Sequence, residues 1–72
     1  MKKISIFGST GSIGTTTLRI VEENPDLFQA ITLVAGRNIE RLIEQIHKFQ
    51  PKHVYITAKE NADRLKEEFP GL

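Results

Sequence analysis

Cysteine is absent from the chain, which excludes a disulfide framework and a thiolate zinc site and fits a reducing compartment. An excess of charge of one sign is also missing, since ten Lys and Arg residues face nine Asp and Glu residues. A nearly neutral chain has no broad electrostatic field to attract nucleic acid or an anionic membrane. We therefore expect neither as a partner, and any functional basic residue must act locally.

Long hydrophobic runs are lacking too, because no apolar stretch approaches the ~20 residues that span a bilayer. The opening Met1-Lys2-Lys3 is similar to the start of a signal peptide, but the apolar run behind it is broken at Ser5 and ends at Gly8. We expect a soluble, cytoplasmic protein. A large core is excluded as well, because a domain of this length buries only about 60% of its unfolded surface.

The chain does contain three strand-like runs that alternate with three helix-like runs, a pattern typical of parallel βαβ units. The expected strands are 3–7, 30–35 and 53–57, and the expected helices are 12–23, 38–49 and 59–69. Right-handed crossovers give the strand order 3-2-1, which is one half of a Rossmann-like, doubly wound α/β sheet. Because the other half is missing, we expect residues 1–72 to be the N-terminal part of a larger nucleotide-binding domain.

Apolar spacing predicts which side of each helix faces the sheet. In the first helix the inward candidates are Ile13, Leu18 and Val21, and in the third they are Ala62, Leu65 and Phe69. The second helix has the clearest stripe, made of Ile39, Leu42, Ile43, Ile46 and Phe49. We assign Gln45 to the solvent-exposed face of this helix, together with the charged residues around it.

Glycine is concentrated where the first strand meets the first helix, at positions 8, 11 and 14. Such a turn needs positive φ or close backbone approach, and the helix that follows offers free N–H groups to an anion. Ser12 is the expected N-cap. The G-x-x-G-x-x-G spacing differs from the familiar G-x-G-x-x-G. A P-loop would need Lys after its last glycine, whereas Thr15 follows Gly14. Neither Ser9 nor Ser12 lies in the G-x-S-x-G sequence of a nucleophile elbow. The motif favours a pyrophosphate cradle, and the alternative is a flexible glycine loop.

The second strand ends in Ala35-Gly36-Arg37-Asn38, where dinucleotide-binding folds meet the adenosine ribose. NAD-binding proteins place an acidic residue there, whereas Arg37 offers donors suited to a 2′-phosphate. This arrangement favours NADP over NAD. The alternatives are that Asn38 is only an N-cap and that Arg37 is only solvated.

No residue supplies a convincing acid, base or nucleophile, and His47 and His53 lack partners at metal-ligand spacing. We therefore expect neither catalytic nor metal-ligating residues in this chain.

The chain resembles the N-terminus of the 1-deoxy-D-xylulose 5-phosphate reductoisomerase family over essentially its whole length. The resemblance rests on four stretches, namely Ile6-Phe7-Gly8-Ser9-Thr10-Gly11-Ser12-Ile13-Gly14, Asn24-Pro25, Leu33-Val34-Ala35-Gly36-Arg37-Asn38 and Phe49-Gln50-Pro51. It implies an NADPH-dependent enzyme of non-mevalonate isoprenoid biosynthesis, which converts 1-deoxy-D-xylulose 5-phosphate to 2-C-methyl-D-erythritol 4-phosphate. It also implies a homodimer and a divalent ion, Mg or Mn, that holds the sugar-phosphate substrate.

By this resemblance, Thr10, Gly11, Ser12 and Ile13 would contact the pyrophosphate region of NADPH, and Gly36, Arg37 and Asn38 the 2′-phosphate end. The family's metal ligands, substrate-phosphate ligands and lid lie beyond the length of this chain, so the chain alone is expected to be inactive. Two alternatives remain open here. One is another NADP-dependent reductase, such as an aspartate-semialdehyde dehydrogenase or an extended short-chain dehydrogenase, and the other is a non-catalytic nucleotide-sensing domain.

Overall fold

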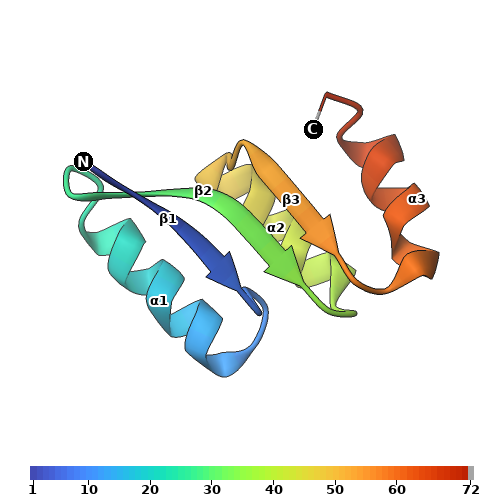
Figure 1. Cartoon of the computed structure of the whole chain (residues 1–72), viewed down its shortest axis with the longest axis horizontal. Helices are drawn as coiled ribbons and strands as arrows, with labels where there is room; N and C mark the ends of the chain where they lie inside the picture. Colours follow the sequence, from blue (N-terminus) through green and yellow to red (C-terminus); the bar gives the residue numbers. More distant parts are fainter. Residues whose placement is uncertain (72) are drawn as a thin grey trace.

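The computed structural model describes residues 1–71, in which three strands alternate with three helices (Figure 1). In chain order the elements are β1 (Lys2–Phe7), α1 (Ser12–Glu23), β2 (Phe28–Ala35), α2 (Ile39–Phe49), β3 (His53–Ile56) and α3 (Lys59–Glu68). The observed bounds differ from the predicted ranges by at most two residues at either end.

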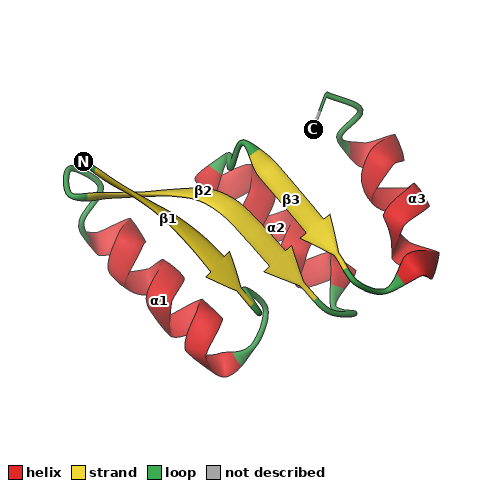
Figure 2. Cartoon of the chain, viewed as in Figure 1, coloured by secondary structure: helices red, strands yellow, loops and turns green. Residues whose placement is uncertain are grey.

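The three strands form one parallel sheet in the order β1-β2-β3, which confirms the predicted half of a Rossmann-like α/β sheet. All three arrows in Figure 2 point to the same edge. Phe7 pairs with Val34 and Val34 pairs with Tyr55, so the carboxyl ends of the strands are level with one another. The turns that follow β1 and β2 therefore leave the sheet side by side.

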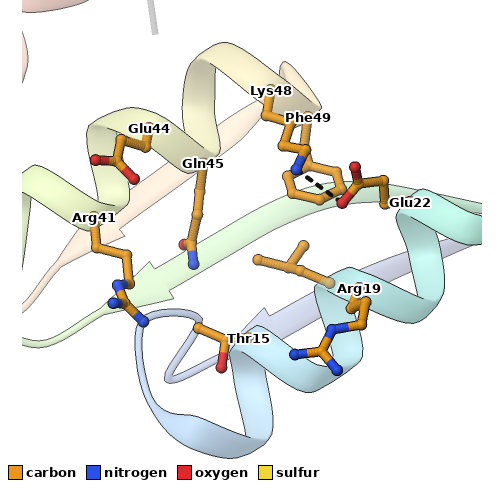
Figure 3. A pocket seen from close by; sticks show the side chains of 9 residues that line it. Thr15, Arg19, Glu22, Arg41, Glu44, Gln45, Lys48 and Phe49 are labelled. Atoms are coloured by element: carbon orange, nitrogen blue, oxygen red, sulfur yellow. Dashed lines mark ion pairs between the residues drawn. The ribbon is translucent and has the colours of Figure 1, made fainter.

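Both α1 and α2 cover one face of this sheet, as Figure 3 shows from the helix side. One row of paired residues, on the face that the helices cover, consists of Ile6, Leu33 and Val54, and Leu33 is fully buried. Neighbouring residues on a strand point to opposite faces. The next row accordingly lies on the opposite face, where Phe7 is 78% and Tyr55 59% exposed. The described chain thus has one covered face and one bare face.

The apolar stripe of α2 is packed as predicted, with Ile39, Leu42 and Ile46 buried and Ile43 and Phe49 partly buried. This helix is capped at its C-terminus by Gln50, which has a left-handed φ of 48° and stands just before Pro51. The third helix lies beside β3 and contributes Leu65 to the core, with Phe69 packed against it. Among residues 1–71, no helix combines the length and apolar character needed to cross a bilayer.

Candidate functional site: the turns after β1 and β2

The turn after β1 bends sharply at Gly8, whose φ of +73° is a conformation that L side chains rarely adopt. The amides of Gly8 and Ser9 both donate to the carbonyl of Val34, at 2.7 and 3.0 Å. The amide of Gly11 then donates back to the carbonyl of Gly8 at 3.0 Å. The main chain of this turn is therefore fixed to β2 and to itself.

Gly14 brings α1 directly against this turn. A Cβ at position 14 would stand 2.6 Å from the Cα of Ser9 and closer still to the Gly8 carbonyl oxygen. Both neighbours are main-chain atoms that cannot rotate away. Gly14 is therefore required for close packing of the helix on the end of β1, the role that the last glycine has in dinucleotide-binding turns.

The N-terminus of α1 leaves several amides unpaired. Thr15 donates to the Gly11 carbonyl at 2.9 Å, but within residues 1–71 the amides of Thr10, Ser12 and Ile13 donate to no acceptor. No acidic side chain lies in the first turn of the helix. Free N–H groups and the positive end of the helix dipole form an arrangement suited to an anion. Thr10, Gly11, Ser12 and Ile13 all belong to this arrangement.

Three details of this turn differ from the sequence predictions. Gly11, not Ser12, is the N-cap, because Gly11 has extended backbone and Ser12 is already helical. The φ of Gly11 is −80°, so positive φ applies to Gly8 and not to Gly11. Ile13 is 84% exposed and was wrongly placed in the core, because Gly14 takes the inward position of the first turn, followed by the buried Leu18.

Main-chain and side-chain hydrogen bonds together hold the turn after β2, where the Gly36 carbonyl accepts from the Ala58 amide at 3.2 Å. The Asn38 Oδ1 accepts from the Arg41 amide at 3.1 Å, which confirms Asn38 as the N-cap of α2. Gly36 has ordinary φ, and a Cβ there would meet only the Thr57 hydroxyl at 3.9 Å. Packing within the described chain therefore does not require a glycine at position 36.

Arg37 lies at the tip of this second turn, with its side chain 85% exposed. Its guanidinium lies 3.4 Å from the Glu60 carboxylate, and its carbonyl accepts from the Asn61 side chain at 3.0 Å. Sequence reasoning missed both neighbours. They are more than 20 positions away and belong to α3, so no local pattern places them beside Arg37.

Gln45 is the second residue that the sequence prediction misplaced. Instead of lying on the solvent-exposed face of α2, it is only 8% exposed, and its Nε2 donates to the Ser9 carbonyl at 2.7 Å. In Figure 3 its side chain extends from α2 into a hollow of about 280 Å³ between α1 and α2. The amphipathic pattern could not reveal this, because Gln45 lies on the edge of the stripe, three positions after the buried Leu42.

The predicted site residues thus fall into two groups at one edge of the sheet. Thr10, Gly11, Ser12 and Ile13 follow β1, while Gly36, Arg37 and Asn38 follow the adjacent strand β2 (Figure 1). The described residues contain no cluster of three His, Asp or Glu side chains that could hold a metal ion.

Comparison with known proteins identifies the family of the chain. The family model for 1-deoxy-D-xylulose 5-phosphate reductoisomerase matches residues 4–71. Proteins of that name from Proteus mirabilis and Microcystis aeruginosa are 49% and 54% identical to the chain over 93% and 92% of its length. A chloroplastic protein of that name from Oryza sativa is 53% identical over 92%. The chain spans 17%, 17% and 14% of these three relatives. Because the family model covers residues 4–71, the chain belongs to the 1-deoxy-D-xylulose 5-phosphate reductoisomerase family.

Proposed function

We propose that residues 1–72 bind the adenosine and pyrophosphate part of NADPH within an enzyme that converts 1-deoxy-D-xylulose 5-phosphate to 2-C-methyl-D-erythritol 4-phosphate. NADPH supplies the hydride in that reaction. The observation that carries the proposal is the open N-terminus of α1, where the amides of Thr10, Ser12 and Ile13 find no acceptor within residues 1–71. These donors suit a pyrophosphate, and Gly11 keeps the surface beside them free of a side chain.

The adenosine end of the cofactor is assigned to Gly36, Arg37 and Asn38. A guanidinium binds a phosphate through parallel N–H donors, so Arg37 suits the 2′-phosphate that distinguishes NADPH from NADH. Its partner Glu60 is 65% exposed, and an exposed ion pair of this kind contributes at most about 1 kcal/mol. Arg37 can therefore exchange this carboxylate for a phosphate at little cost.

We assign catalysis to the further residues of a protein as long as these relatives. Residues 1–71 do not fit the Mg or Mn ion of the family, because they hold no cluster of metal-ligating side chains. We place the metal ligands, the sugar-phosphate site and the homodimer contacts outside this chain, and the enzyme in the cytoplasm. Because the chain belongs to the reductoisomerase family, we set aside the two other classes of reductase that the sequence left open. A purely nucleotide-sensing domain receives no specific support from the structure.

Titration of the ¹⁵N-labelled chain with NADPH and NADH tests the proposal. We expect NADPH to shift the amides of Thr10–Ile13 and of Gly36–Asn38 with weaker than micromolar affinity, and NADH to shift mainly the first group. Adenosine 2′-monophosphate should perturb the second group alone, and adenosine 5′-monophosphate serves as its control. No reductoisomerase activity is expected from the chain alone. Equal effects of NADPH and NADH at Arg37, or no shift in either group, would contradict the assignment.

A further inference from the structure

The main chain of Ser9 in the first turn contacts three other elements, although its hydroxyl oxygen is buried without a partner among residues 1–71 and Ser9 is not among the proposed nucleotide contacts. It is fully buried, and its amide donates to the Val34 carbonyl of β2. Gly14 of α1 packs against its Cα, and its carbonyl accepts from Gln45 of α2 at 2.7 Å. Three elements therefore fix one residue, and the hydrogen bond from α2 is the one made by a side chain.

The orientation of the Gln45 amide is determined by this bond. Its Oε1 is buried without a partner among residues 1–71, so no second hydrogen bond selects the orientation. Reversing the amide would place Oε1 against the Ser9 carbonyl oxygen, which is also an acceptor. An unsatisfied buried oxygen is costly, so a purely apolar side chain would suit this place better for packing alone. The group that gains from a glutamine here is the Ser9 carbonyl.

That carbonyl shares one planar peptide unit with the amide of Thr10, in which C=O and N–H point in opposite directions. Holding the Ser9 oxygen inward, toward α2, therefore directs the Thr10 N–H outward. The Thr10 amide is one of the donors that find no acceptor within the described chain. A hydrogen-bonded carbonyl also polarises its peptide unit, which strengthens the N–H as a donor.

We propose that Gln45 is a positioning residue for the anion-binding turn: its Nε2–H···O bond to Ser9 sets the direction of the Thr10 amide and thereby raises affinity for the nucleotide pyrophosphate. The effect on affinity rests on the proposed function, whereas the effect on the turn does not. Because the pyrophosphate is common to both cofactors, Gln45 acts equally on NADP⁺ and NAD⁺. It differs in this respect from Arg37, whose effect depends on the 2′-phosphate.

The first measurement needs no cofactor. In the wild-type chain, the side-chain amide protons of Gln45 should exchange with solvent at least about tenfold more slowly than those of the exposed Gln50, because the Gln45 amide is buried and bonded. Gln45→Met keeps the length and removes the donor. It should speed exchange of the Ser9 and Gly11 amides about tenfold and leave Leu33 in the sheet unchanged. Glu44→Met, one position earlier on the exposed side of α2, is the matched control.

The second measurement is the dissociation constant of each cofactor. Gln45→Met should weaken NADP⁺ and NAD⁺ by the same factor, about fivefold to tenfold, as expected for one lost buried hydrogen bond. If that variant unfolds, Gln45→Leu, which also lacks a donor and is a good helix former, should give the same local pattern. Fast exchange of the wild-type Gln45 amide, an unchanged turn in both variants, or a loosened turn with unchanged affinity would each overturn the proposal. A wild-type chain that binds neither cofactor would refute the proposed function, and the exchange data alone would then decide the role of Gln45 in the turn.

Discussion

The two turns at the carboxyl edge of the sheet differ in how closely their main chains are packed. The turn after β1 depends on close main-chain packing, with Gly8 at positive φ and Gly14 pressed against the Ser9 backbone, and the Gln45 side chain adds one hydrogen bond. The turn after β2 has no such close main-chain packing, and the Asn38 cap, the Asn61 amide and main-chain bonds to the Gly36 and Arg37 carbonyls hold it. A main-chain site suits any pyrophosphate, whereas an exposed side chain such as Arg37 can distinguish one nucleotide from another. The first turn is thus expected to resist substitution, and the second to tolerate it and to set specificity.

Gly14→Ala should give the largest effect. The new methyl group has no space between two main-chain neighbours, so helix α1 must move away from β1. We expect a loss of about 3 kcal/mol or more in the free energy of unfolding, at the upper end of overpacking costs. In a domain of this size that corresponds to a decrease in Tm of more than about 12 °C, measured by circular dichroism.

Gly36→Ala is the matched control in the second turn. Its methyl group would be 3.9 Å from the Thr57 hydroxyl, and the backbone there needs no positive φ. The free energy of unfolding should change by no more than about 0.5 kcal/mol. Equal melting temperatures for the two variants would refute the contrast between the turns.

Arg37→Glu should have the next largest effect, on cofactor choice instead of stability. It removes the donors and places a negative charge against the 2′-phosphate, a loss of about 2 to 4 kcal/mol for NADPH by analogy with other charged hydrogen bonds. Arg37→Lys keeps the charge and should retain most of the preference. Titrations with NADPH and NADH measure the effect, and a ratio that changes by less than about twofold in the Glu variant would disprove the role of Arg37.

Gly8→Ala should have an intermediate effect on stability. A residue with a Cβ pays about 1 to 2 kcal/mol for the left-handed conformation that Gly8 adopts, although space is available for the methyl group. Gly11→Ala should cost less, because Gly11 has φ of −80° and its Cβ would lie 3.4 Å from the Gly8 carbonyl oxygen. Urea unfolding of both variants checks this order, and a larger loss for Gly11→Ala would contradict it.

Glu60→Gln should give the smallest effect. Removing the carboxylate frees Arg37 from its 3.4 Å partner and reduces repulsion of a 2′-phosphate. Because the pair is exposed, we expect NADPH affinity to rise only about twofold to threefold, with NADH affinity unchanged. Parallel titrations with both cofactors measure this. The effect should disappear at high salt, and persistence in 1 M salt would show that the ion pair is not its cause.

The contrast between the turns also explains what the sequence predicted and what it could not. The strand order follows from right-handed crossovers, the stripe of α2 and the Asn38 cap follow from local spacing, and the structure confirms all three. The burial of Gln45 and the Arg37–Glu60 pair depend on packing between elements far apart in the chain. The predicted burial of Ile13 was wrong for a related reason, since the close approach of Gly14 determines which residue of the first turn faces inward.

The bare face of the sheet carries a natural fluorescent probe in these 72 residues. Tyr55 is the single tyrosine of a chain without tryptophan, and it lies on that face at the end of the row that begins with Phe7. Its fluorescence therefore comes from one known position, on the side of the sheet away from α1 and α2. Any element or molecule that covers this face must change the emission of Tyr55, so coverage of the sheet is measurable without a label.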